Sequence, residues 1–250
     1  AKTENAAHLG GFMGYASAGI VILQDGFVNS GNITHGGSTN GADAISLGGV
    51  FGYITAAPLS YESSTTTGEG DDAVTTTTTV SWTGNIVNTG TITGAGKSGG
   101  GQCRFGGIVG LCKQSLVGTA KYINTGNIVF TGTAGSKNGV AGTGWIGGIV
   151  GVLENATIDN AEVHCSIQYG ESKDYGFITG VARSTTVLAT NCKIGGVTLG
   201  EWDDEDQVYK ETKINSSNYY NFIYGSGKNT DWTGTDNYDG CSYISVAPTL

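Results

Sequence analysis

The chain has 250 residues, of which 44 are glycine and only two are proline, and charged residues make up 13%. Glycine is far above its average share of about 7%, and charge is about half its usual share. Collagen is excluded because no Gly-X-Y period occurs, and a disordered chain is disfavoured because 38% of the residues are hydrophobic. Gly, Thr, Asn and Ser suit helix interiors poorly. The composition therefore predicts an all-β protein with many turns.

The net charge is −9, from 12 basic and 21 acidic residues. A protein with this balance and no basic stripe is a poor partner for nucleic acid or for an anionic membrane surface. No stretch approaches the about 20 apolar residues of a membrane-spanning helix. No signal peptide is visible at Ala1, so the leader of an exported protein would have been cleaved or would lie upstream of Ala1.

The first repeated element begins at residue 9 and reads apolar-Gly-Gly-apolar-apolar-Gly. Clear copies span 9–14, 47–52, 105–110 and 146–151, and weaker copies span 175–180 and 220–225. We predict short inward-facing strands with a corner, at which glycine permits positive φ and close backbone approach. The glycine pairs of the clear copies are Gly10, Gly11, Gly48, Gly49, Gly106, Gly107, Gly147 and Gly148.

The second repeated element follows the first at a variable distance and contains Asn-x-Gly. Asn-x-Gly predicts a turn, because both residue types tolerate the left-handed region. An Asn that recurs at one corner also predicts amides stacked from one repeat to the next. The clear copies contain Asn29, Asn88 and Asn124, and looser copies centre on Asn160, Asn191 and Asn237.

Three segments depart from these repeats. The insertion at 58–82 contains a threonine run, which fits either a flexible loop or a projecting β-hairpin. A shorter Gly/Ser-rich insertion spans 94–101. Residues 201–250 carry a degenerate repeat and an unusually charged stretch, which we interpret as a cap on the end of the repeats.

Together these features predict a single domain over 1–250 that forms a parallel β-helix, or β-solenoid, with repeats over 9–200. Variable spacing between copies favours this architecture over a helix-pair solenoid, because loops of any length can leave a β-solenoid at its corners.

The two elements resemble the GLUG-type repeats of adhesin-like surface proteins from Bacteroides-type gut bacteria. The resemblance covers about residues 9–200. It implies a parallel β-helix, right-handed, that is exported to the cell surface or the extracellular space. Some relatives carry the label immunoglobulin A protease, because similar repeats accompany such enzymes.

The sequence contains no recognisable catalytic or cofactor motif. The three histidines, His8, His35 and His164, lack the context of a zinc protease or a serine protease. Phosphate-loop and dinucleotide lookalikes lack the required strand-to-helix setting. The five cysteines match no zinc or disulfide framework, so we expect buried thiols, with one disulfide between Cys103 and Cys112 left open. We therefore predict no cofactor, no metal and no catalytic residue.

The candidate binding residues lie near the C-terminus, where carboxylates and aromatic rings occur together. Aromatic rings could stack on sugars, and paired carboxylates could cleave glycosidic bonds. The leading hypothesis is a non-catalytic adhesin-like module that presents loops to glycans or to host or cell-surface proteins. A polysaccharide-cleaving β-helix, or the repeat-bearing part of a larger immunoglobulin A protease-like protein, remains open. The candidates are Trp202, Asp203, Asp204, Asp206, Tyr219 and Trp232.

Overall fold

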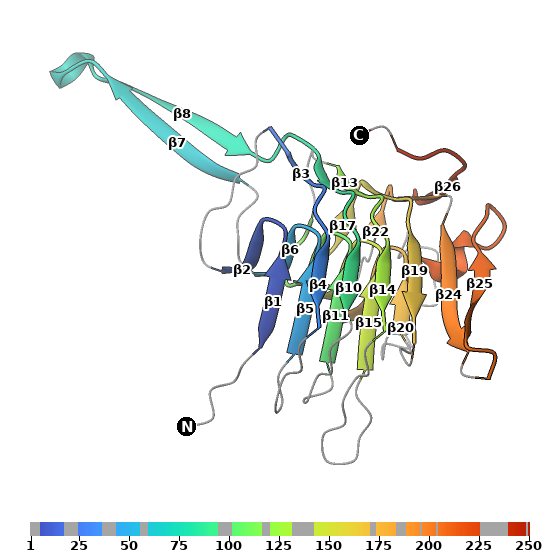
Figure 1. Ribbon diagram of the computed structural model, residues 1–250. Helices are drawn as coiled ribbons and strands as arrows, with labels where there is room; N and C mark the ends of the chain where they lie inside the picture. Colours follow the sequence, from blue (N-terminus) through green and yellow to red (C-terminus); the bar gives the residue numbers. More distant parts are fainter. Residues whose placement is uncertain are drawn as a thin grey trace, which may run out of the picture.

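A computed structural model describes most of the chain, and within it the regular structure is β-strand with two short 3-10 helices, η1 (Gly70–Asp72) and η2 (Tyr219–Phe222). The prediction of an all-β protein with parallel sheets is therefore confirmed (Figure 1). The described residues are 6–17, 25–36, 44–55, 60–94, 102–116, 121–131, 143–170, 174–183, 189–195, 197–203, 205–225, 240–248 and 250.

Four main sheets, here named A to D, contain most of the strands. Sheet A has the order β1 (Ala7–Gly10), β5 (Ala44–Gly48), β11 (Gln102–Gly106), β15 (Thr143–Gly147) and β20 (Asp174–Gly176). Sheet B has the order β2 (Met13–Ser17), β6 (Phe51–Thr55), β12 (Val109–Cys112), β16 (Val150–Glu154) and β21 (Thr179–Arg183).

Sheets C and D are built in the same way. Sheet C contains β3 (Phe27–Asn29), β9 (Ile86–Asn88), β13 (Tyr122–Asn124), β18 (Ala161–Val163), β23 (Lys193–Gly195) and β26 (Ser242–Ile244). Sheet D contains β4 (Ile33–His35), β10 (Ile92–Gly94), β14 (Ile128–Phe130), β19 (Ser166–Tyr169), β24 (Thr198–Asp203) and β25 (Val208–Lys213). A small parallel pair joins β17 (Ile158–Asp159) to β22 (Ala189–Thr190).

From β1 to β24 the chain visits sheets A, B, C and D in the same order on each circuit, and each new strand of these sheets pairs in parallel with its predecessor from the previous circuit. β25 instead pairs antiparallel with β24. Leu9, Leu47, Phe105, Ile146 and Tyr175 are register partners along sheet A, so five copies of the first element align residue by residue. The sixth copy continues this register, because Phe177 and Ile178 donate backbone hydrogen bonds to Phe222 and Ile223.

One hydrophobic core runs through these circuits. Most of the apolar residues of the repeats pack into it, and Leu47, Ile108 and Ile146 are fully buried. Burying a side chain of this size contributes about 1.5 to 3 kcal/mol. The repeated apolar positions therefore stabilise each circuit against the next.

The two repeated elements contact each other. In the first element the chain bends at the glycine pair, so that β1 ends at Gly10 and β2 begins at Met13. A Cβ on Gly107 would lie 2.0 Å from the carbonyl oxygen of Gly148 and 2.3 Å from Cγ of Asn124. A Cβ on Gly49 would likewise lie 2.3 Å from Cγ of Asn88. Glycine recurs here because the asparagine leaves no room for a side chain.

The predicted asparagine ladder is present. Asn29 Nδ2 donates to Asn88 Oδ1 at 2.7 Å, and Asn88 Nδ2 donates to Asn124 Oδ1 at 2.8 Å. Each amide also donates to the carbonyl oxygen two residues on, at 2.9 to 3.0 Å. The ladder ends at Asn124 because its register partner in β18 is Val163.

The prediction that glycine and asparagine recur in order to adopt positive φ was wrong for most of these residues. Among the described residues, the glycine pairs and Asn29, Asn88 and Asn124 all lack positive φ. The left-handed region is used instead by Asn160 and Asn191, at 59° and 51°. These two are turn residues and not members of the ladder, and Asn237 lies outside the described residues.

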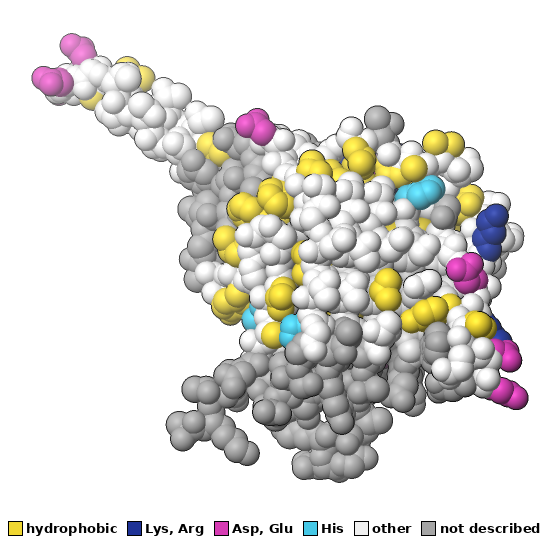
Figure 2. All heavy atoms as spheres, in the orientation of Figure 1, with side chains coloured by type: hydrophobic (Ala, Val, Ile, Leu, Met, Phe, Trp, Pro, Cys, Tyr) yellow, Lys and Arg dark blue, Asp and Glu magenta, His cyan; other side chains and the backbone are white. Residues whose placement is uncertain are grey.

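The insertion at 58–82 forms a β-hairpin, so the loop alternative is not what the structure shows. β7 (Ser60–Thr67) pairs antiparallel with β8 (Val74–Ser81), and the pair projects from the body of the protein (Figure 1). Hydroxyl pairs cross it, Ser64 with Thr77 at 3.0 Å and Thr66 with Thr75 at 2.9 Å. Glu69, Asp71 and Asp72 are exposed at its tip, where Figure 2 shows acidic side chains. Of the second insertion, only Gly94 lies within the described residues.

Candidate functional site

The predicted C-terminal carboxylates take part in a turn and its ion pairs. β25 runs antiparallel to β24, and Asp203 Oδ1 accepts backbone hydrogen bonds from Glu205 and Asp206 at 2.9 and 3.0 Å. Lys210 forms an ion pair with Asp203 and another with Asp206, the latter at 3.2 Å. The Lys210 hydrogen bond, followed by these backbone donors, lowers the pKa of Asp203. Both carboxylates are therefore ion-pair partners of one lysine, and this arrangement accounts for them structurally.

The predicted aromatic residues are not gathered around these carboxylates in the described part of the chain. Tyr219 is half-buried, and its hydroxyl donates to the carbonyl oxygen of Cys241 at 3.2 Å. Its ring lies 6.3 Å from that of Tyr243, so it holds the last strand of sheet C in place. Trp202 is in β24, in register with Tyr209, and its side chain is outside what the structure describes, as are Asp204 and Trp232.

A different set of side chains forms the better candidate site. We name it the aromatic–polar patch. It consists of side chains on the first strands of sheets A and B that point away from the main core. In sheet A, His8, Ser46 and Arg104 each precede the first apolar residue of the repeated element and are register partners. In sheet B, Tyr15 and Tyr53 are register partners. The patch consists of His8, Tyr15, Ser46, Tyr53 and Arg104.

The three rings of the patch contact one another. The centroids of Tyr15 and Tyr53 are 4.8 Å apart, and the His8 ring lies 5.6 Å from Tyr15 and 5.3 Å from Tyr53. Tyr15 is 50% exposed, the largest exposure among the rings of this cluster. Burial, followed by the charge of Arg104, lowers the pKa of His8. The imidazole is therefore neutral at pH 7 and can both donate and accept a hydrogen bond.

Three side chains of the patch each have one buried polar atom without a hydrogen-bond partner in the described part of the chain. Within the described residues, His8 Nδ1, Ser46 Oγ and Arg104 Nε are buried and make no hydrogen bond. Buried polar atoms are nearly always hydrogen-bonded, so three such atoms on consecutive strands of one sheet call for an explanation. Arg104 is held in place at its other end, where Nη2 donates to Gln102 Oε1.

Further along the same two sheets, the corresponding positions are occupied differently. Trp145 Nε1 donates to Asp174 Oδ2 at 2.9 Å, and the Arg183 guanidinium lies 4.5 Å from the centre of the Trp145 ring. The sheet B positions after Tyr53 are Leu111, Val152 and Val181, which form a small buried cluster with Trp145. Buried contacts thus give way toward β1 and β2 to the exposed ring of Tyr15 and to polar atoms without a hydrogen bond in the described residues.

Close approach of the two sheets explains why the patch forms. A Cβ on Gly52 would lie 2.6 Å from the backbone nitrogen of Leu9, and one on Gly110 would lie 2.7 Å from that of Leu47. Glycine at these positions brings the strands of sheets A and B together. The side chains at the neighbouring positions then face each other across the two sheets.

Sequence reasoning missed this patch because its residues lie just before or just after the repeated apolar and glycine positions. An alignment of the copies would have found it. The position before the apolar residue reads His8, Ser46, Arg104, Trp145 and Asp174, and the position after the last glycine reads Tyr15, Tyr53, Leu111, Val152 and Val181.

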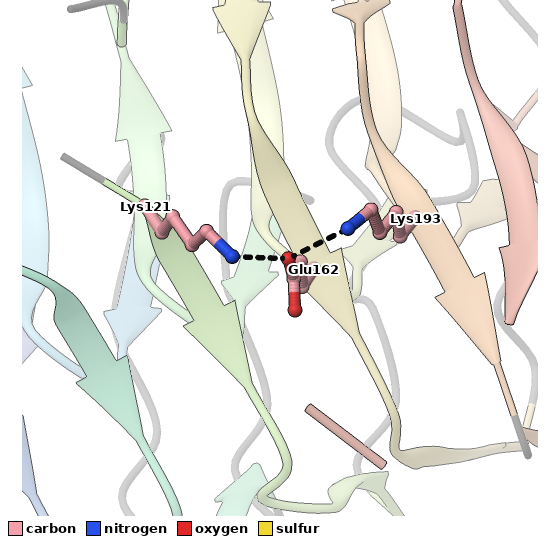
Figure 3. Close-up of polar contacts among 3 residues, drawn as sticks. All are labelled: Lys121, Glu162 and Lys193. Atoms are coloured by element: carbon pink, nitrogen blue, oxygen red, sulfur yellow. Dashed lines mark hydrogen bonds and ion pairs between the residues drawn. The ribbon is translucent and has the colours of Figure 1, made fainter. Parts of the chain in front are cut away.

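One buried charge in sheet C has a structural role. Glu162 is 5% exposed, and its Oε1 accepts hydrogen bonds from Lys121 at 2.9 Å and Lys193 at 3.4 Å (Figure 3). Burial alone raises the pKa of Glu162, but the hydrogen bonds and charges of the two lysines outweigh it, so the pKa is lowered. Glu162 therefore joins neighbouring strands, and its lowered pKa keeps the carboxylate ionised at neutral pH, where it cannot act as a proton donor.

Within the described residues, no group of three or more His, Cys, Asp or Glu side chains is placed to hold a metal ion, and no helix is long and apolar enough to cross a membrane. Comparison with protein-family models, with curated proteins and with solved structures finds no match.

Proposed function

We propose that the protein is a non-catalytic, adhesin-like β-solenoid of the GLUG-repeat type, exported to the cell surface, that binds glycans through the aromatic–polar patch. The observation that carries this proposal is the exposed Tyr15 ring, paired with the half-buried Tyr53 ring, beside His8, Ser46 and Arg104, each of which has a buried polar atom without a hydrogen-bond partner in the described chain.

The solenoid part of the proposal rests on the order of the strands. The chain passes through sheets A, B, C and D repeatedly, and the copies of both repeated elements stack in register. Such stacking gives an elongated, rigid support from which loops leave at the corners. A rigid support that carries a projecting hairpin suits a surface module, and the handedness remains a prediction from the resemblance.

The glycan part of the proposal rests on the chemistry of the patch. A sugar ring has an apolar face of C–H groups, which stacks on aromatic rings, and a rim of hydroxyl groups, which need hydrogen-bond partners. Tyr15 and Tyr53 supply the rings. His8 and Arg104, both half-buried, supply a neutral imidazole and a cationic donor, and the fully buried Ser46 lies between them in register along sheet A. A specific site combines an apolar surface with a few placed polar groups in this way.

A glycan array with the purified chain tests the proposal. We expect binding to a restricted set of glycans, lost in the Tyr15→Ala/Tyr53→Ala variant and retained in Tyr243→Ala, which removes one ring of a tyrosine pair elsewhere. A variant without the hairpin over 60–81 should also bind. Binding that disappears with the hairpin and survives the tyrosine substitutions would place the contact on the hairpin instead. Shortening of a bound polysaccharide would contradict a non-catalytic role.

A further inference from the structure

Two cysteines from segments far apart in the sequence lie next to each other. β23 and β26 pair in parallel with Lys193 opposite Ser242, and the Ser242 amide donates to the Cys192 carbonyl at 2.9 Å. The preceding residues, Cys192 and Cys241, are therefore neighbours one position before these strands.

Both side chains face the core side of sheet C. Cys192 is fully buried in the main core, and Cys241 is partly buried and packs against it. Cys192 Sγ lies 3.2 Å from the Thr190 carbonyl oxygen, and Cys241 Sγ lies 3.9 Å from that of Ala189. The thiol of Cys241, followed by burial, raises the pKa of Cys192, which is a sign that the two thiols are in contact.

The spacing suits a disulfide. Neighbouring strands lie about 4.8 Å apart, and disulfides join residues whose Cα atoms are about 4.4 to 6.8 Å apart. The two cysteines that lie within strands, Cys103 and Cys112, have no cysteine as a register partner. Cys103 has Ile45 and Gly144 as register partners, and Cys112 has Ile54 and Leu153. The open alternative of a Cys103–Cys112 disulfide is not what the structure shows, since both are thiols on strands of different sheets.

We infer that Cys192 and Cys241 form a disulfide between adjacent circuits when the protein meets a disulfide oxidant. The partly exposed Cys241 thiolate attacks one sulfur of a low-molecular-weight disulfide and expels the first thiolate. Cys192 then loses its proton, and its thiolate attacks Sγ of Cys241 and expels the second thiolate. Two protein thiols are oxidised to one S–S bond, and the oxidant takes up two electrons and two protons to become two thiols.

The bond would fasten the last strand of sheet C to the circuit before it. It would close a loop that contains the β24–β25 turn, η2 and the residues up to β26. Closing a loop of this kind restricts the unfolded chain and so stabilises the folded one. The oxidising conditions of an exported protein favour the bond, but the chemistry itself can be tested in solution without that assumption.

The test uses the full chain incubated with oxidised glutathione, then denatured and alkylated. We expect three of the five cysteines to be alkylated, and peptide mapping should find the link between Cys192 and Cys241. Cys241→Ser should leave four alkylated cysteines, and Cys112→Ser should leave two, with the same link. The oxidation rate should rise with pH, because each of the two attacks requires a thiolate. Five alkylated cysteines in the wild type, or a link between another pair, would overturn the inference.

Discussion

Replacement of Asn88 by alanine tests whether the asparagine ladder stabilises the stacked circuits. Asn88 is fully buried, accepts one hydrogen bond from Asn29, and donates to Asn124 and to the Gly90 carbonyl. Each of these three hydrogen bonds contributes about 1 kcal/mol net. The variant should therefore lose about 3 kcal/mol of unfolding free energy. Urea unfolding monitored by circular dichroism measures this loss, and the dependence of the unfolding free energy on urea concentration should be unchanged.

A second asparagine provides the matched control. Asn32 is exposed, and its side chain accepts a single hydrogen bond from the Thr91 amide at 2.9 Å. Asn32→Ala should cost no more than about 0.5 kcal/mol, as is usual for surface substitutions. If Asn88→Ala and Asn32→Ala have equal midpoints, the ladder does not stabilise the fold and the reasoning is refuted.

Two further changes give separate predictions. Glu162→Gln should cost about 1 kcal/mol at pH 7. The pKa of Glu162 is lowered in the folded protein, so the stability difference between the wild type and Glu162→Gln should be full above about pH 5 and should vanish as the pH falls through the folded pKa. A stability difference that persists at pH 2 would contradict this prediction. Gly107→Ala should cost at least about 3 kcal/mol by thermal unfolding, because its Cβ would meet a backbone oxygen at 2.0 Å. Gly36→Ala, where a Cβ has no neighbour within 4 Å, should be nearly neutral; equal costs would refute the packing argument.

The sequence was sufficient to predict the stacking of the repeats. Leu9 aligns with Leu47 and Asn29 aligns with Asn88, as the repeated letters indicate. The sequence did not show that the glycine pair packs against the asparagine, because the two elements lie at variable separations along the chain. Only the folded circuit brings Gly49 and Asn88 into contact.

The candidate site was predicted less well. The acidic stretch near Asp203 attracted attention by its charge, but Lys210 on the paired strand forms ion pairs with Asp203 and Asp206. Pairing of this kind depends on the antiparallel return of β25, which composition cannot show. The aromatic–polar patch depends on residues such as Tyr15 in the first circuit and Arg104 in the third, neither of which stands out in the sequence.

The central claim is that the aromatic–polar patch binds a sugar, and the most direct measurement is calorimetric titration of the best glycan into matched variants. Two stacking rings at about 1 kcal/mol each predict at least tenfold weaker binding for Tyr15→Ala/Tyr53→Ala. Arg104→Met, which removes the cationic donor while keeping the length of the side chain, should also weaken binding. Unchanged affinity in both variants, with folding confirmed by an unaltered unfolding midpoint, would contradict the account.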